Sequence, residues 1–309
     1  MAEFLRNIQT SIISSNYLNG IRSDDACLSI EANTTIKSLS AYSFSLIHMN
    51  SDNSAEIHNN ILSEMNAAKL EKLITADTVA VLIFGACENH GDHMPFGSDF
   101  IMPYDLAKRV ATKYQNILVC PPVPYGVSSH HKDFLMTISL EPDTMVKVVH
   151  DILQSLVSNN ISRILIINGH DGNIAPIELA SRTIKEMHPS IVISCLESWW
   201  TLVGQIDKEL FNVWDALAHG GEGETSAMLA IRPDLVDMTL APEEVIPNLP
   251  DKIRIYWKFN ELTKTGATGA PRKATVEKGQ KLIEILENLL LNFIADMDKN
   301  QWKYGKTRS

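Results

Sequence analysis

The residues best suited to chemistry in this chain lie between positions 85 and 99. Five groups that can bind a metal ion occur there within a dozen residues, separated by glycines and a proline: Glu88, His90, Asp92, His93 and Asp99. They directly follow the apolar run Thr78–Phe84, which is typical of a buried strand. Open α/β sheets bind their ligands at the carboxyl ends of strands. So many carboxylates and imidazoles at such a position indicate a metal site rather than a solvated surface.

Two later segments have the same character. A strand-like run ending at Ile167 leads into Asn168-Gly-His-Asp-Gly-Asn173, and His219-Gly-Gly-Glu-Gly-Glu-Thr-Ser226 leads into an apolar helix. Each segment alone is more often structural, because glycines turn the backbone and acids favour helix N-termini. Three such clusters, each at a strand end or a helix start, favour one shared metal centre.

The residue types fit two metal ions better than one. Glu88 and His90 are two residues apart, so an extended backbone points both to the same side. Each could bind a different ion, with Asp99 bridging through its two oxygens. A set of carboxylates and imidazoles without thiolate suits Zn²⁺, Mn²⁺ or Fe²⁺. Two ions about 3.5–4 Å apart can lower the pKa of a bridging water and polarise a carbonyl. The expected chemistry is hydrolysis by a metal-bridging hydroxide.

Short apolar runs alternate with longer amphipathic segments after position 60. The strands are predicted at Val79–Phe84, Ile117–Cys120, Arg163–Ile167 and Ile191–Leu196. The helices are predicted at Ile61–Leu73, Tyr104–Tyr114, Pro142–Val157, Ala175–Met187, Glu224–Ala230 and Val276–Phe293. This alternation predicts an α/β fold, a three-layer α/β/α arrangement with a mostly parallel central sheet.

The rest of the chain has a different composition. Residues 1–55 are rich in Ser, Asn and Thr and are expected to form an irregular N-terminal extension. Residues 56–298 are expected to form the hydrolase domain, and residues 299–309 a frayed polar tail.

Composition excludes several classes of function. A formal net charge of −10 argues against nucleic-acid binding, which favours a basic face. No stretch approaches the roughly 18 apolar residues of a membrane span. The four cysteines are widely spaced and no signal peptide is visible, which suits a reducing compartment. We therefore expect a cytoplasmic protein that acts on a small molecule.

The three clusters, in this order, resemble the creatininase (creatinine amidohydrolase) family. The family pattern Glu-x-His-Gly-x-His-x-Pro-x-Gly-x-Asp is matched by residues 88–99, Asn-Gly-His-Gly-Gly-Asn by residues 168–173, and His-Ala-Gly-Glu-x-Glu-Thr-Ser by residues 219–226. The segment Tyr125–Phe134 resembles a fourth family stretch, Gly-x-Ser-x-x-His, and this places His131 near the site. The similarity covers roughly residues 60–295.

The resemblance implies the three-layer fold, two divalent metal ions per chain, and homo-oligomers that are commonly hexamers. By motif position, Glu88 and His170 would bind one ion and His90 the other, while Asp99 would bridge them. His219 matches a residue that passes the proton from water to the leaving nitrogen.

Departures from the family pattern bear on the substrate. Where creatininases proper carry a tyrosine and a ligating glutamate, this chain has Asp171 and Gly172. We infer that Glu222 supplies the lost carboxylate as a ligand and takes part in catalysis, with Glu224 as the other candidate ligand. Asp171 is either a specificity residue or a helix cap. Trp214 is the nearest candidate for an aromatic lid over the substrate.

The expected reaction is cleavage of a C–N bond in a small, cyclic amide other than creatinine. The alternatives on the same site are a lactone, a formamide or a cyclic ketone, or a metal-binding homologue without catalysis. A thiol hydrolase that uses Cys87, with His90 or His93 as base, is a further alternative.

Two pairs of neighbouring residues complete the expectations. At most one of His130 and His131 should face the site, since neighbours point apart in an extended chain. Trp199 and Trp200 follow a strand, and either could line a pocket, with core packing expected for at least one of them.

Overall fold

The protein is described by a computed structural model that covers residues 60–212, 218–250 and 253–308. The described residues belong to one compact unit, His58–Ser309, and the predicted extension 1–55 lies outside them. Four strands form one sheet in the order β2-β1-β3-β4. The strands are β1 (Val79–Phe84), β2 (Ile117–Val119), β3 (Arg163–Asn168) and β4 (Val192–Leu196), and every pair is parallel.

The strands form where the sequence has short, continuous apolar runs. All six residues of β1 are buried, as expected for a parallel strand covered on both faces. Side chains alternate between two cores: Val81 and Ile83 pack into one, and Leu82 and Phe84 into the other. All four predicted strands are confirmed, with ends that differ by no more than one residue.

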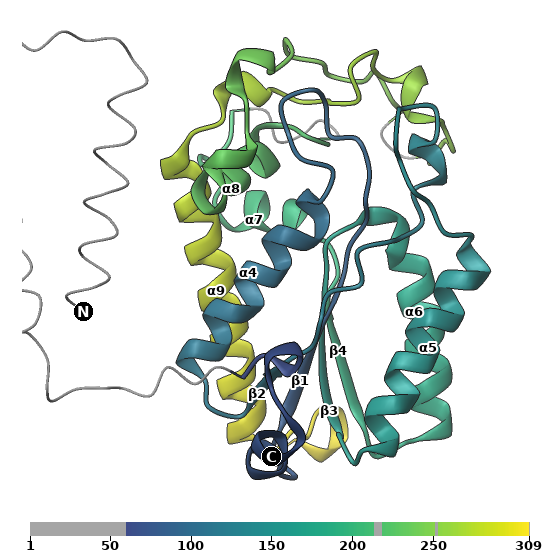
Figure 1. Cartoon of the computed structure of the whole chain (residues 1–309), viewed down its shortest axis with the longest axis vertical. Helices are drawn as coiled ribbons and strands as arrows, with labels where there is room; N and C mark the ends of the chain where they lie inside the picture. Colours follow the sequence, from purple (N-terminus) through teal and green to yellow (C-terminus); the bar gives the residue numbers. More distant parts are fainter. Residues whose placement is uncertain (1–59, 213–217, 251–252, 309) are drawn as a thin grey trace, which may run out of the picture. The chain divides into compact units, whose positions relative to one another are not determined.

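Helices cover both faces of the sheet and make it the middle of three layers (Figure 1). Helices α4 (Ser98–Lys113), α7 (Trp199–Ile206), α8 (Glu222–Ile231) and α9 (Val276–Lys299) contribute to the core on one face. Helices α5 (Pro142–Ser158) and α6 (Ile174–Met187) pack on the other. This arrangement confirms the predicted three-layer α/β/α fold.

Several elements differ from the sequence prediction. Helix α4 begins at Ser98 rather than at Tyr104, and it contains Pro103, which directly precedes the predicted start. The early start places Asp99 in the first turn of α4. The predicted helix Ile61–Leu73 is divided into a 3₁₀ turn, Leu62–Glu64, and helix α3, Ala67–Leu73. Helix α7 was not predicted.

The segment after α9 is not a frayed tail within its described residues. Trp302 is only 5% exposed and its indole donates a hydrogen bond to Asp298. Phe293 of α9 meets the Trp302 ring edge-on at 6.2 Å between centroids. One buried aromatic in a polar stretch is therefore enough to anchor the chain end.

Within the described residues, no helix has both the length and the apolar character that crossing a membrane requires.

Candidate metal centre

The predicted clusters meet at the carboxyl edge of the sheet. Glu88 and His90 lie in the loop after β1, Asp99 in the first turn of α4, His170 after β3, and Glu224 in the first turn of α8. Gly169 makes the close approach possible, because a Cβ atom there would lie 1.7 Å from the Asp99 carbonyl oxygen. The glycines that flank the polar residues are thus a steric requirement of the site.

Two carboxylates of this cluster are buried, and three of their four oxygens have no hydrogen-bond donor among the described residues. Glu88 is fully buried and Asp99 is 5% exposed. Both carboxylate oxygens of Glu88 and the Oδ2 atom of Asp99 have no hydrogen-bond partner among the described residues. Because a buried charge without a partner is strongly unfavourable, such oxygens require a cation. This donor set fits a divalent metal ion.

Two histidines present a ring nitrogen to these carboxylates. His90 Nδ1 lies 3.1 Å from the Glu88 carbonyl oxygen, and His170 Nε2 lies 2.9 Å from that of Val127. A carbonyl oxygen only accepts, so these nitrogens carry the hydrogen and the opposite nitrogens hold the lone pair. Such a bond to a carbonyl commonly orients a metal-binding histidine.

Asp99 lies between the two histidines. Its Oδ1 is 2.8 Å from His90 Nε2, and its Oδ2 is 3.3 Å from His170 Nδ1. His170 Nδ1 is also 3.3 Å from Glu88 Oε1. Each oxygen of Asp99 therefore faces a different imidazole, which is the arrangement that a carboxylate bridging two ions needs.

The two candidate acids of α8 have different surroundings. Glu224 Oε2 lies 3.8 Å from His90 Nε2, and Glu224, His90 and His219 form one of the groups whose ligand atoms lie within 4.8 Å of one another. Glu222 instead accepts hydrogen bonds from the Asn212 amide and the Lys278 ammonium group. Residues two apart on a helix point about 200° apart. The geometry thus favours Glu224 as the ligand, in place of the expected Glu222.

Gly172 is too closely packed to be replaced by a residue with a side chain. A Cβ atom at this position would lie 2.0 Å from the Val127 carbonyl oxygen and 2.7 Å from His170 Nε2. No side chain fits there without movement of the backbone, so position 172 cannot supply a metal ligand.

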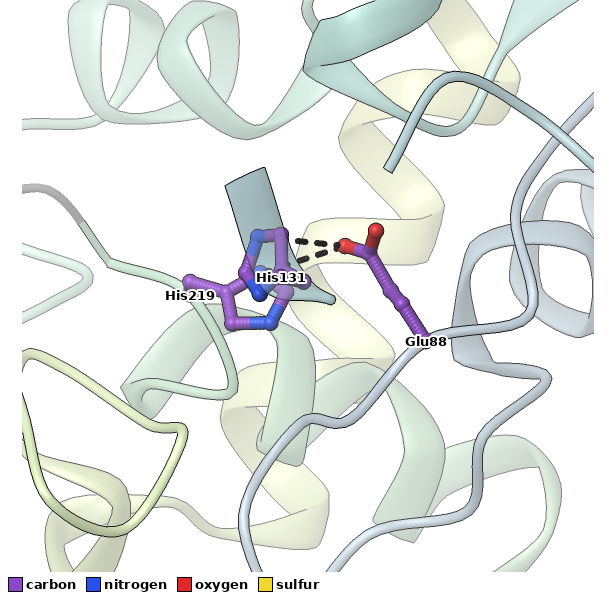
Figure 2. Close-up of side chains that lie close together, drawn as sticks. All are labelled: Glu88, His131 and His219. Carbon is purple, nitrogen blue, oxygen red and sulfur yellow. Dashed lines mark ion pairs between the residues drawn. The ribbon is translucent and has the colours of Figure 1, made fainter. Parts of the chain in front are cut away.

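His131 and His219 lie side by side and face Glu88 (Figure 2). His131 Nε2 and His219 Nδ1 are each 3.7 Å from Glu88 Oε1. His219 is held by the 2.7 Å contact of Nε2 with the Asn89 carbonyl oxygen and by hydrogen bonds of its backbone with Thr268. Since Asn89 O can only accept, Nδ1 of His219 is the nitrogen free to take up a proton.

Burial sets the charge of these two histidines. It lowers the pKa of His131 to about 3 and the pKa of His219 well below its ordinary value, so both rings are neutral at pH 7. Burial also opposes the charged form of His90, but the Asp99 carboxylate outweighs it and raises the pKa of His90 to about 10. Burial opposes the charged form of His170 as well, yet Glu88 holds the pKa of His170 well above its ordinary value. Without metal, protons on His90 and His170 balance the two carboxylates.

The cavity at these ligands has a volume of about 70 Å³ and aromatic walls. It is lined by His130, His131, Trp200, Trp257 and Phe259, besides the polar residues above. The expectation that only one of His130 and His131 faces the site is wrong, because Ser129–His131 is a 3₁₀ turn rather than an extended segment. Trp200 lines the cavity while Trp199 is buried in the core, as expected for this pair.

Other sequence candidates fall outside the cluster or outside the description. Trp214 lies outside the described residues. Asp171 lines the cavity and is not the cap of α6, whose N-cap residue is Asn173. Trp257 and Phe259 were missed; an aromatic pair two residues apart in a loop was the only signal available.

Cys87 is poorly suited to nucleophilic attack. Burial raises the pKa of its thiol, and the carboxylates of Glu88 and Asp99 raise it further. The thiolate that a thiol hydrolase requires is therefore disfavoured at neutral pH.

Comparisons with known proteins identify the family of this chain. The family model described as creatinine amidohydrolase matches residues 63–294. A creatinine amidohydrolase of Pseudomonas putida is 32% identical over 233 residues, which cover 69% of this chain and 87% of the relative. A mycofactocin precursor peptide peptidase of Mycolicibacterium smegmatis is 27% identical, covering 66% of this chain and 79% of the relative.

Solved structures show the same fold. A mutant creatininase of the Zn-Zn type superposes with a TM-score of 0.68 at 28% identity, covering 77% of this chain and 97% of the other. A manganese creatininase gives a TM-score of 0.67 at 28% identity, with 76% and 97% of the two chains covered.

Proposed function

We propose that this chain, which belongs to the creatininase (creatinine amidohydrolase) family, is a binuclear metal-dependent hydrolase that cleaves the C–N bond of a small amide. The observation that carries the proposal is the set of buried carboxylate oxygens of Glu88 and Asp99 that have no hydrogen-bond donor in the described structure. They lie among imidazole nitrogens whose lone pairs face them. Buried acids that serve only the fold are normally satisfied by the protein itself.

The proposed ligand sets divide the cluster in two. Glu88, His170 and Oδ2 of Asp99 would hold one ion, and His90, Glu224 and Oδ1 of Asp99 the other. When bound, two such ions supply an activated water and polarise the substrate carbonyl. Zinc and manganese are the metals named for the related creatininase structures, and both suit ligands of this type.

The chain's own residues would move the proton and hold the substrate. His219 is neutral, and its Nδ1 faces Glu88, so it can accept a proton from the attacking water and deliver it to the leaving nitrogen. Because the Asn89 carbonyl oxygen accepts from Nε2, the tautomer is fixed in the form that catalysis needs. His131 and Phe259 pack against the His219 ring and hold it in place.

The substrate is proposed to differ from creatinine. Asp171 and Gly172 stand where the resemblance places the tyrosine and glutamate of creatininases proper, so the wall beside His170 carries an acid instead of an aromatic ring. The relatives include both a creatinine amidohydrolase and a peptide peptidase, which supports amide hydrolysis as the shared reaction. Lactams, formamides and short acyl-amino compounds are therefore the first substrates to test, followed by lactones.

The experiment that tests this proposal measures metal content and amide hydrolysis on the same purified protein. We expect elemental mass spectrometry of the purified protein to find about two Zn or Mn ions per chain. A chelator should abolish hydrolysis of the amide panel, and adding Zn²⁺ or Mn²⁺ should restore it. Metal bound without hydrolysis of any amide or lactone would favour a non-catalytic metal-binding homologue. Absence of metal after reconstitution would overturn the hydrolase proposal.

We also propose that the protein is cytoplasmic and forms homo-oligomers. Cys87, Cys120 and Cys195 are free thiols, which supports a reducing, cytoplasmic environment. Homo-oligomers, hexamers among them, remain a proposal from the family resemblance. Exposed apolar side chains such as Leu135 (82%) and Met136 (64%) would suit a subunit contact, and light scattering tests it.

A further inference from the structure

A second cavity of about 270 Å³ adjoins the metal centre. It shares three walls, His130, Asp171 and Trp257, with the smaller cavity that holds the metal ligands. Its other walls are Val127, Ser129, Gly172, Arg254, Ile255 and Tyr256. Because the two cavities have these residues in common, they lie side by side along the segment that carries His130 and Asp171.

Arg254 brings a positive charge to this second cavity. Its Nη2 atom lies 3.8 Å from Asp171 Oδ2, which is longer than a hydrogen bond. The two side chains are 75% and 57% exposed, and exposed pairs of this kind contribute little to stability. The guanidinium also lies over the Tyr256 ring, 5.4 Å from its centroid. The guanidinium therefore has a cation–π contact with Tyr256, while Asp171 holds it only weakly.

The other polar groups of the cavity do not carry the same charge. Arg254 is the only lysine or arginine among the described residues that line this cavity. His130 stacks parallel to the ring of His170 at 5.8 Å between centroids, and forms the wall between that ligand and the cavity. Asp171 directly follows His170 in the chain, so the charge pair stands beside the metal centre. A planar guanidinium in such a place is suited to bidentate binding of a carboxylate.

We propose that Arg254 is a specificity residue that binds a carboxylate on the substrate, a few bonds from the C–N bond held at the metal centre. The carboxylate would replace Asp171 as the partner of the guanidinium, and the larger cavity would hold the chain that joins the two ends. This inference rests on the proposed amide hydrolysis and narrows its substrates to small amides or lactams that also carry a carboxylate.

Two matched pairs of probes test the proposal. 5-Oxoproline and N-formylglycine each carry a carboxylate, and 5-oxoprolinamide and N-formylglycinamide replace it with a neutral amide. The metal-loaded full chain is tested as wild type, Arg254→Gln and Asp171→Asn. Arg182→Gln is the control, because Arg182 is also exposed and also pairs with an acid, Glu178, but on the outer surface of α6.

Substitutions of Arg254 and Asp171 should have different effects on the preference for the charged probes. We expect a preference for the charged probes of about 10- to 100-fold in kcat/KM, the size of a hydrogen-bonded charge pair. Arg254→Gln should remove that preference, mainly through KM, and leave the neutral probes within about twofold. Asp171→Asn should keep or increase the preference, since it removes the competing carboxylate. A pair with only a structural role would weaken both kinds of probe in both variants.

Calorimetric binding of the four probes separates the two proposals. Hydrolysis of charged and neutral probes at equal rates, unchanged in Arg254→Gln, would overturn the role of Arg254 and leave the amidohydrolase standing. Binding of the charged probes that is lost in Arg254→Gln, with no hydrolysis of any probe, would uphold Arg254 and overturn the amidohydrolase. Neither hydrolysis nor charge-dependent binding would overturn both.

Discussion

Carboxylates at the two ends of the sheet differ in whether the protein supplies hydrogen-bond donors to them. Near the amino end of β3, Asp298 accepts hydrogen bonds from the Tyr114 hydroxyl, the Trp302 indole and the Arg163 guanidinium. At the carboxyl end, Glu88 and Oδ2 of Asp99 are buried more deeply and have no donor among the described residues. The protein satisfies the first acid with its own donors and leaves the second pair to a cation.

The difference separates an acid that stabilises the fold from acids kept for chemistry. The carboxylate of Asp298 links the segment after α9 to α4 and β3, and its hydrogen bonds stabilise the folded state. In the metal-free protein the two buried carboxylates are balanced by protonated His90 and His170, and divalent ions would take the place of those protons. Variants at the two ends should therefore lose different properties.

The largest effect is expected at Asp99. Asp99→Asn keeps the shape of the side chain but removes the charge that both ions would share. Metal content should fall from about two ions to one or none, and kcat/KM should fall at least about 100-fold, since each ion is worth several kcal/mol in the transition state. Elemental analysis and steady-state kinetics measure both. An Asp99→Asn variant that keeps two ions and full activity would contradict the bridged centre.

The two acids of α8 provide a comparison within one helix. Glu224→Gln should lower metal content and reduce activity by about 10- to 100-fold, as loss of a group that orients or binds the metal does. Glu222→Gln should keep the metal but lower the free energy of unfolding by about 1–3 kcal/mol, because Lys278 and the Asn212 amide lose a charged partner. Metal analysis beside urea unfolding distinguishes them, and the reverse outcome would restore Glu222 as the ligand.

At the opposite end of the sheet the expected loss is one of stability alone. Asp298→Ala removes the acceptor shared by Tyr114 and Trp302, and should lower the free energy of unfolding by about 1–3 kcal/mol. Metal content and kcat/KM should stay at wild-type values. If Asp298→Ala also releases metal, the hydrogen bonds of Asp298 are coupled to the metal centre. The distinction between an acid for stability and acids for chemistry would then be wrong.

The last comparison is a pH dependence of stability that metal should change. In the metal-free protein the pKa of His90 is raised to about 10, so its pairing with Asp99 stabilises the fold fully below about pH 6.5 and is lost as pH rises toward 10. The pKa of His131 is lowered to about 3, so stability falls as pH drops from about 6.5 toward 3. Metal-free stability should thus be greatest near neutral pH.

Binding of metal replaces the proton on His90, so the alkaline decrease in stability should disappear in the loaded protein. Urea unfolding at pH 5, 7 and 9, with and without metal, measures both curves. Identical alkaline slopes in the two forms would show that His90 is not a ligand.

The sequence by itself determined the sheet, the layers and most of the cluster. Continuous apolar runs at 79–84 and 164–167 can only be buried on both faces, and this implies helices on each side. Because parallel strands end at one edge, Glu88, His90 and His170 had to come together there. Glycines around them indicated close backbone approach, which the contact between Gly169 and Asp99 explains.

Only the tertiary structure decided which side chains complete the site. Glu222 and Glu224 are equivalent in sequence, and the choice between them depends on where Lys278 of α9 lies, 56 residues beyond Glu222 along the chain. His130 faces the cavity because Ser129–His131 forms a 3₁₀ turn, and Arg254 meets Asp171 from a distant part of the chain. Local patterns predict local conformation, whereas contacts between distant segments depend on how the helices and loops pack over the sheet.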